Sequence, residues 1–307
     1  MIDPARAAAA AYIVAALTCV SSCGGASSEA QADETSQEPR VTLVTGSTGG
    51  LGREVARRLA ADGAHVIVHG RDEARGRSLV EEIEASGAGS ARFYRADFAS
   101  LDGVRALADA IRRDYDRLDV LVNNAGILVS PDARPLSRDG HELHFQVNYL
   151  AGFLLTRLLL PMLEAAAPSR IVNVSSLSSA PLDFDDVMLE RGYSSGRAYG
   201  QSKLAQIMFT LELATRLEGS GVTVDAIHPA TFMDTGLVRG FGGTPRTTVD
   251  EGAEAVVGLV DPAEPGSGRF FNGLSPFRAH PQAYDRVARE RLWMLSERLT
   301  GLSDPPR

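Results

Sequence analysis

From residue 40 onward, the chain alternates short runs of β-branched and aliphatic residues with longer segments whose apolar residues recur at helical spacing. Continuous apolar runs are typical of strands buried on both faces, and strands that alternate with helices form parallel sheets. The expected strands are 41–44, 65–68, 91–95, 119–122, 170–174, 223–227 and 269–271. The pattern therefore predicts the α/β class: one doubly wound domain with a parallel sheet of about seven strands and helices on both faces.

The segment from about 141 to 166 is predicted to be a helix rich in apolar residues. It carries Phe153, Leu154, Leu155, Leu158 and Leu159. So much apolar surface has to be covered by the sheet, by a partner subunit, or by both.

Residues 1–39 have a different character from the rest of the chain. An apolar run of 14 residues, 7–20, is followed by Ser21-Ser22-Cys23 and then by a stretch rich in Ser, Glu, Gln and Asp. Val20 to Cys23 resembles the cleavage site of a bacterial lipoprotein, but the run is shorter than the ~20 residues that a membrane-spanning helix needs. A lipoprotein export signal, a short membrane anchor and a non-native extension from an upstream start codon all remain open. The folded domain is expected to span 40–307.

Composition narrows the chemistry. The 307 residues carry a formal net charge of −8 and no dense run of Lys or Arg, whereas nucleic-acid binding needs basic residues that displace counterions from phosphates. Both cysteines lie before residue 24, so the rest of the chain offers no disulfide, thiolate nucleophile or Cys-based metal site. His141 and His144 have only Asp139 and Glu142 near them, which does not complete a metal-ligand set. We expect a small-molecule substrate, no nucleic acid and no metal.

A glycine-rich loop, residues 45–52, directly follows the first expected strand and opens a helix. Glycine lets the backbone turn tightly and approach a pyrophosphate, and the helix N-terminus supplies N–H donors and partial positive charge. In this context the loop predicts dinucleotide binding.

The end of the second expected strand bears on the choice between NAD and NADP. An NAD site usually places an acidic residue there to bind the ribose hydroxyls. Here the chain reads His69-Gly70-Arg71-Asp72, and the guanidinium of Arg71 suits a 2′-phosphate. NADP is therefore favoured and NAD stays an alternative, since Arg71 can instead pair with Asp72 or face solvent.

Tyr199 and Lys203 lie four residues apart in a segment expected to be helical, so their side chains project from one face. A Tyr hydroxyl ordinarily has a pKa of about 10, and a neighbouring cation lowers it toward working pH. Such a pair can exchange a proton with a carbonyl or an alcohol. The same spacing also arises by chance, so the rest of the chain has to support it.

Four motifs in order resemble the short-chain dehydrogenase/reductase family over nearly all of residues 40–300. They are the loop 45–52, Asn123-Asn124-Ala125-Gly126, the segment 170–176, and Tyr199 with Lys203. Further details are similar to the retinol-dehydrogenase-like and protochlorophyllide-reductase-like members: Arg71-Asp72 with Arg75-Gly76, residues 97–101, residues 139–143, and an inserted loop at 183–197. The resemblance implies a Rossmann-type fold and NADPH-dependent reduction of bulky lipophilic carbonyls.

The resemblance also implies roles for individual residues. Tyr199 would be the general acid, Lys203 would lower its pKa and hold the nicotinamide ribose, Ser176 would bond the carbonyl oxygen, and Asn148 would complete a tetrad through a helix bend and a water relay to Lys203. The resemblance implies further cofactor contacts, and those at the phosphates are Gly46, Ser47, Thr48, Gly50, Leu51 and Gly52. The other implied contacts are Asp97 and Phe98 at the adenine, Asn124, Ala125 and Gly126 near the ribose, and Pro229, Thr231 and Thr235 at the nicotinamide amide. The chain departs from the family at Ala230, where glycine is usual.

Three functions compete. The leading one is an NADP-dependent oxidoreductase that interconverts a carbonyl and an alcohol on a lipophilic substrate. A non-catalytic dinucleotide-binding regulator or scaffold is the alternative. The intact tetrad argues against it, because a regulator needs no proton relay. A sugar epimerase uses the same Tyr and Lys but normally has a larger C-terminal region.

The substrate pocket is expected from the inserted loop 183–197 and the segment 236–249. The C-terminal stretch with Tyr284, Ala288, Leu292, Leu295 and Leu299 is expected to close it. We further expect a homodimer or homotetramer, a cytoplasmic location set by the cofactor pool, and membrane association, if any, through residues 1–39.

Overall fold

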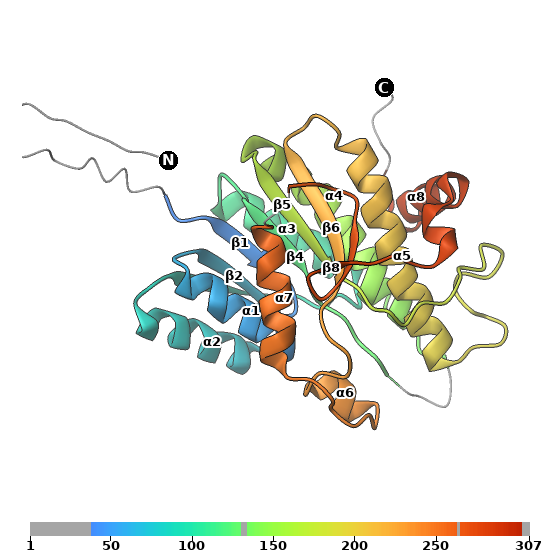
Figure 1. Cartoon of the computed structure of the whole chain (residues 1–307), viewed down its shortest axis with the longest axis horizontal. Helices are drawn as coiled ribbons and strands as arrows, with labels where there is room; N and C mark the ends of the chain where they lie inside the picture. The colour runs from blue at the N-terminus through green and yellow to red at the C-terminus, as the bar shows by residue number, and fades with distance from the viewer. Residues whose placement is uncertain (1–37, 130–133, 263–264, 303–307) are drawn as a thin grey trace, which may run out of the picture. The chain divides into compact units, whose positions relative to one another are not determined.

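Eight strands form one sheet in the order β3-β2-β1-β4-β5-β6-β7-β8, and all neighbours pair in parallel except β7 and β8 (Figure 1). The computed structural model describes residues 38–129, 134–262 and 265–302. The strands are β1 Val41–Val44, β2 His65–Gly70, β3 Ser90–Arg95, β4 Val120–Asn123, β5 Ser169–Val174, β6 Val222–His228, β7 Phe270–Asn272 and β8 Ser275–Pro276. The predicted fold class and its parallel strands are confirmed, and the short antiparallel β8 was not predicted.

Successive residues of the central strands face opposite sides of the sheet. Leu43 and Leu121 belong to one hydrophobic core, whereas Val44 and Val122 belong to the other. Because side chains alternate along a strand, a run without polar residues needs cover on both faces. This is why the strands read as continuous apolar runs.

Helices supply that cover. One face packs against α1, α2 and α7, and the other packs against α3, α4 and α5 (Figure 1). The bounds are α1 Gly50–Ala61, α2 Glu73–Ser86, α3 Leu101–Asp114, the π-helix η1 Phe145–Leu150, α4 Ala151–Ala165, α5 Ser195–Arg216, α6 Gly236–Gly240, α7 Val249–Val260, the 3-10 helix η2 Pro281–Tyr284 and α8 Arg286–Thr300.

Side chains cap the N-termini of the main surface helices. Asp72, Ser100, Ser194, Thr248 and Asp285 each accept a hydrogen bond from a backbone N–H in the first turn of α2, α3, α5, α7 and α8. Helix α1 begins differently, because its N-cap is Gly49, no side chain caps it, and its first turn holds no acidic residue. The first turn of α1 therefore lacks the side-chain acceptor that these five helices have.

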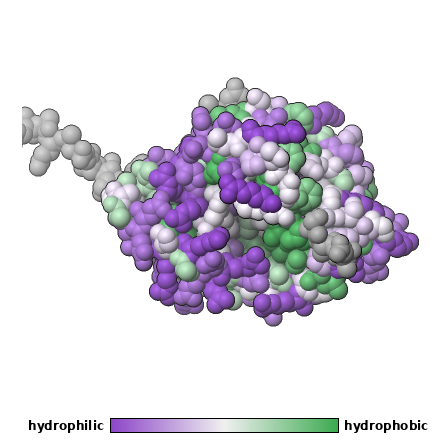
Figure 2. Space-filling model, turned by 90° about the horizontal axis from the view of Figure 1, so that it is seen from below, coloured by the Kyte–Doolittle hydropathy of each residue, from purple (hydrophilic) through white to green (hydrophobic). Residues whose placement is uncertain are grey.

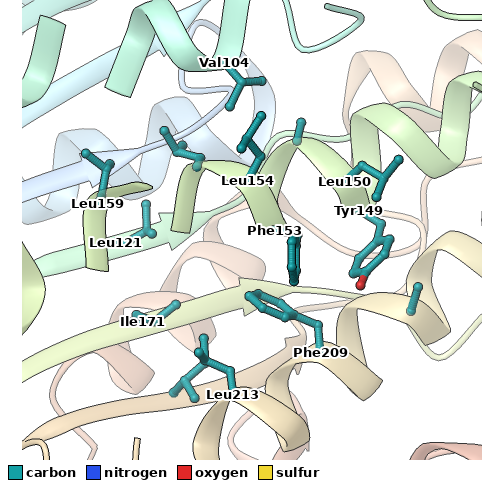
Figure 3. Close-up of a cluster of buried hydrophobic side chains, with 14 of the residues drawn as sticks. Val104, Leu121, Tyr149, Leu150, Phe153, Leu154, Leu159, Ile171, Phe209 and Leu213 are labelled. Carbon is teal, nitrogen blue, oxygen red and sulfur yellow. The ribbon is translucent and has the colours of Figure 1, made fainter. Parts of the chain in front are cut away.

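The apolar segment predicted at 141–166 forms η1 followed by α4. By length and composition, Phe145–Ala165 is apolar enough to span a membrane, but 67% of its most apolar window is buried inside the protein. Phe153 of α4 points toward Phe209 of α5, with ring centres 5.3 Å apart (Figure 3). Trp293 of α8 stacks against Phe209 with ring centres 6.0 Å apart. The sheet and the chain's own helices thus cover this segment.

Two expectations about the ends of the chain have different outcomes. Helix α8 packs on α5 rather than over a substrate pocket, so the expected closure by Tyr284, Ala288, Leu292, Leu295 and Leu299 is wrong. The leader prediction falls on residues 1–37, which lie outside the described residues.

Candidate active site

The carboxyl ends of the parallel strands open into a cavity of about 800 Å³. Strand β1 lies between β2 and β4, and the helices that follow β1 and β4, which are α1 and α4, cover opposite faces of the sheet. This change of face leaves a crevice at the carboxyl ends of the two strands. The cavity is lined by the segments that follow β1 to β6, and these carry most of the predicted site residues. The predicted residues along its wall are Gly46, Thr48, Gly50, Leu51, Gly52, Arg71, Asp97, Phe98, Asn124, Ala125, Gly126, Ser176, Tyr199, Lys203, Pro229, Thr231 and Thr235.

The glycine loop leaves room that a side chain would fill. Gly46 has a φ of 66°, and a Cβ there would lie 2.8 Å from the Cα of Ala125. A Cβ at Gly52 would lie 2.4 Å from Nδ2 of Asn124. Only glycine therefore lets the loop, the first turn of α1 and the segment after β4 approach so closely. With the uncapped N-terminus of α1 on the cavity wall, this cradle fits the diphosphate of a dinucleotide.

Ser47 does not line the cavity, although it was predicted to contact the phosphates. Its side chain is fully buried, and Oγ donates to the carbonyl of Val44 at 2.8 Å. Its backbone N–H donates to the carbonyl of His69 at 2.8 Å. Ser47 therefore holds the loop against β2 and does not line the cavity.

His69 is a site residue that the sequence did not reveal, because it reads as one more position of a buried strand. Its Nδ1 accepts a hydrogen bond from the N–H of Gly46 at 3.1 Å, and its ring stacks on Phe98 with centres 4.4 Å apart. Burial lowers the pKa of His69 to about 4. The imidazole is therefore neutral at physiological pH, as an Nδ1 acceptor has to be.

Two guanidinium groups lie at the end of the cavity beyond Phe98. Arg71 and Arg75 both line it. Nη1 of Arg71 lies 4.0 Å from a carboxylate oxygen of Asp97, and Nε of Arg75 lies 3.3 Å from Asp72. The side chains are 69% and 72% exposed, so both remain able to turn toward an anion. Arg75 was not predicted as a contact, although its position four residues after Arg71 was a signal for it.

Tyr199 and Lys203 lie at the opposite end, on one face of α5. Nζ of Lys203 lies 5.7 Å from the centre of the Tyr199 ring, and the Tyr199 hydroxyl is hydrogen-bonded to Ser176. Lys203 is buried and donates to the carbonyl of Val174 at 3.0 Å and to Oε1 of Gln206 at 2.9 Å. The fold thus brings Ser176, which follows β5, to the Tyr and Lys of α5.

The charge states of this pair differ from the sequence expectation. Burial raises the pKa of Tyr199, and the hydrogen bond with Ser176 acts in the opposite direction. Burial also lowers the pKa of Lys203 to about 7. The expected lowering of the Tyr199 pKa by a neighbouring cation is therefore absent in the protein by itself, because burial dominates and Lys203 holds its own proton weakly.

Asn148 lies inside η1 and does not line the cavity. Its Oδ1 accepts from the N–H of Ile127 at 2.7 Å, and its Nδ2 donates to the carbonyl of Ile127 at 3.1 Å and to Oγ of Ser202 at 2.9 Å. A Cβ at Gly126 would lie 3.4 Å from Oδ1 of Asn148 and 3.5 Å from Nζ of Lys203. Asn148 therefore joins the segment after β4 to the helix that carries the Tyr and Lys.

Apolar side chains line the cavity beyond Tyr199. They are Leu128, Leu143, Val147, Leu177, Phe232, Leu237, Val238 and Phe241. Figure 2 shows the face of the molecule on which α6 lies. This face has a hollow, and hydrophobic residues gather beside it. The segment 236–249 contributes as expected, but the inserted loop 183–197 contributes only Gly196, so its expected role as the main pocket wall is wrong.

The segment after β6, where Ala230 replaces the usual glycine, still reaches the cavity. His228 is buried, and its Nε2 lies 2.9 Å from Oγ1 of Thr231. Burial and the nearby Lys203 lower the pKa of His228 to about 4. Phe232 has a φ of 51°, a left-handed conformation that is uncommon for a large side chain.

The fold and this arrangement are those of a dinucleotide-dependent oxidoreductase of the α/β class. A family model for the short chain dehydrogenases matches residues 40–242. Retinol dehydrogenase 12 of Bos taurus is 37% identical over 277 residues, which cover 86% of this chain and 87% of the bovine protein. The chain belongs to the short-chain dehydrogenase/reductase family and is homologous to retinol dehydrogenases, as its motifs predicted.

Solved structures agree with this assignment. An uncharacterised protein from Mycobacterium paratuberculosis is 33% identical, with a TM-score of 0.73, and the match covers 87% of this chain and 95% of that one. A short chain dehydrogenase from Burkholderia cenocepacia in complex with NADP is 29% identical, with a TM-score of 0.63 and coverage of 77% and 96%. The family implies NAD or NADP as the cofactor. Within residues 38–129, 134–262 and 265–302, no group of three or more His, Cys, Asp or Glu is placed to hold a metal ion.

Proposed function

We propose that the protein interconverts a carbonyl and an alcohol on a lipophilic substrate, with NADP(H) as cofactor and Tyr199 as general acid and base. The observation that carries this proposal is the set of elements that line the cavity. Arg71 and Arg75 line it from the end of β2 and the start of α2, the glycine cradle lines it after the neighbouring β1, and Tyr199 lines it from α5, which packs on β5 and β6.

Two observations support NADP over NAD. Arg71 follows directly on β2, where an NAD site would place an acid that repels a phosphate, and Arg75, in the first turn of α2, lines the same cavity. Both guanidinium groups are largely exposed and have only solvent-accessible carboxylates near them. A 2′-phosphate could displace these contacts with stronger charge-assisted hydrogen bonds.

The proposed chemistry uses three side chains. The bound cofactor supplies or accepts the hydride at the substrate carbon. In the reducing direction, the Tyr199 hydroxyl donates its proton to the substrate oxygen, and Ser176 donates a hydrogen bond to that oxygen as negative charge develops. Lys203, fixed by Val174 and Gln206, faces the Tyr199 ring and stabilises the phenolate that remains. Oxidation of an alcohol runs through the same groups in reverse.

The lipophilic character of the substrate is inferred from the wall beyond Tyr199. Apolar side chains come from the segments after β4, β5 and β6 and from α6. Burial of apolar area is the main driving force for a ligand in such a wall. Retinol dehydrogenases, which are homologous to this chain, are named for retinol, a lipophilic alcohol, which supports the proposal.

Turnover tests the proposal directly. Purified protein is assayed with NADPH and a panel of aldehydes, ketones and quinones, beside Tyr199→Phe and the matched control Tyr193→Phe. We expect Tyr199→Phe to lower kcat by roughly 10²- to 10⁴-fold with NADPH affinity unchanged, and Tyr193→Phe to stay near wild type. If wild type and Tyr199→Phe bind NADPH alike and neither reduces any of the panel, the regulator or scaffold alternative is favoured.

We also propose a cytoplasmic location, because the enzyme needs a supply of pyridine nucleotide. Cell fractionation, with mass spectrometry of the native N-terminus, tests it. A lipidated Cys23 on an exported protein would overturn it.

A further inference from the structure

We propose that Glu142 and His144 form a positioning pair that holds the wall of the substrate site in place. The pair fixes residues 127–129, called here the post-β4 segment, against the turn that leads into η1. The inference rests on the proposed function for the meaning of the wall, but the hydrogen bonds that define the pair are independent of it.

Glu142 is fully buried, and its carboxylate accepts three hydrogen bonds. Oε1 accepts from the N–H of His144 at 3.0 Å and from Nδ1 of His144 at 2.8 Å, and Oε2 accepts from the N–H of Phe145 at 2.7 Å. These bonds satisfy backbone donors at the start of a helix, which also favours a negative charge. The carboxylate thus sets both the turn and the orientation of the His144 ring.

His144 connects Glu142 to the post-β4 segment. Since Nδ1 donates to Glu142, the neutral ring has its acceptor at Nε2, and Nε2 accepts from the N–H of Val129 at 3.2 Å. His144 is itself fully buried. The ring therefore spans a carboxylate on one side and the backbone of the post-β4 segment on the other.

Three further hydrogen bonds tie the same segment to the catalytic helices. The side chain of Asn148 pairs with both backbone groups of Ile127, and Oγ of Ser195 donates to the carbonyl of Val129. Ser195 lies one helical turn before Tyr199 on α5. The post-β4 segment is consequently held from η1, from the turn before it and from α5.

The apolar wall depends on this anchoring. Leu128 lies between the two anchored residues, and Leu143 lies between Glu142 and His144; both line the cavity. The inserted loop supports the turn from outside, because Sδ of Met188 accepts from the N–H of Glu142 at 3.4 Å. Loss of the His144 acceptor would leave the Val129 N–H unpaired and free Leu128 and Leu143 to shift.

Two isosteric variants separate this role from simple burial. In His144→Gln the amide oxygen reaches the position of Nε2 and can still accept from Val129, whereas in His144→Asn it reaches only the position of Nδ1. We expect His144→Asn to raise KM for the best carbonyl substrate about 10-fold, with kcat and NADPH affinity within 2-fold, and His144→Gln to restore KM toward wild type. Tyr149→Phe is the control, since it removes an equally buried bond, to Ser296, away from the cavity.

Hydrogen exchange gives a readout that needs no turnover. In the wild-type full chain, the Val129 amide should exchange roughly 100-fold more slowly than an unprotected amide, and this protection should fall in His144→Asn but not in His144→Gln. An unprotected Val129 amide in wild type would overturn the proposal even if no variant folds. Equal KM values in the Asn and Gln variants, or a loss of stability in both without a change in KM, would also overturn it. An inactive wild type with a protected Val129 would count against the proposed function and leave the pair in place.

Discussion

Nζ of Lys203 lies 5.7 Å from the centre of the Tyr199 ring, and both of its hydrogen bonds go to uncharged oxygens. Burial alone accounts for the lowering of the Lys203 pKa to about 7. The protein therefore keeps a lysine that holds its proton weakly near neutral pH, next to a phenol whose own pKa is raised. An opposite charge bound next to this pair would favour the protonated form of Lys203 and so offset the cost of burying it.

The first prediction concerns stability against pH. The Lys203 pKa rises from about 7 in the folded protein to the ordinary 10.5 on unfolding, so the unfolded state binds more protons between these values. The contribution of Lys203 to the free energy of unfolding should therefore increase as pH rises through this window, by on the order of a few kcal/mol. Chemical denaturation of wild type and Lys203→Met from pH 6.5 to 9.5 measures it, and parallel pH curves for the two proteins would contradict it.

The second prediction concerns cofactor choice. Arg71→Ala and Arg75→Ala should each weaken NADPH binding by about 10-fold and leave NADH binding unchanged, because each removes a charge-assisted partner of the 2′-phosphate. Arg77→Ala is the control, since Arg77 lies on α2 as Arg75 does and pairs with Glu73. Titration by fluorescence or calorimetry gives both affinities. An equal loss for NADPH and NADH would mean that these residues do not read the 2′-phosphate.

The third prediction concerns His69. His69→Phe keeps a ring against Phe98 but removes the acceptor of the Gly46 N–H. We expect NADPH and NADH binding to weaken together, by roughly 5- to 10-fold, because the loop that holds the shared diphosphate loses an anchor. This parallel loss distinguishes His69 from Arg71. Unchanged affinity for both cofactors would show that the loop keeps its shape without the imidazole.

The fourth prediction concerns the helix that opens the site. Replacing glycine by alanine inside a helix usually stabilises it by up to about 1 kcal/mol. Gly52→Ala should instead destabilise the protein and weaken NADPH binding, because the new Cβ would meet Asn124 and the Gly46 carbonyl. Gly196→Ala in α5, where nothing lies within 4 Å of the added atom, is the control. Thermal unfolding measures the stability of both variants, and a Gly52→Ala protein as stable as the Gly196→Ala control would refute the close packing at Gly52.

Most of the strands could be predicted from the sequence because they are covered on both faces of the sheet. Their runs of Val, Ile and Leu have no competing helical period, and the glycine loop marks the first of them. Strand β8 escaped because two residues with a proline make no periodic signal. The helix expected from about residue 141 begins at Leu143 and continues through η1 into α4, close to its predicted start.

The candidate site was predicted where spacing carries the chemistry and was missed where only contacts do. Tyr199 and Lys203 share a helix face at four residues' separation, which a sequence shows directly. His69 and His144 act through Gly46 and Val129, which are distant in sequence, and each reads as an ordinary buried position. The inserted loop was taken for a pocket wall because its length is visible, whereas its packing behind Glu142 is not.

Helix α1 begins at the cavity wall, and no side chain caps its first turn. A dinucleotide phosphate would complete that turn, so the ligand acts as a missing piece of the folded chain as well as a reactant. Binding of this kind stabilises the folded state by mass action. We therefore expect the abundance of this enzyme in its cell to follow the supply of its nucleotide, with unliganded molecules unfolding and being degraded first.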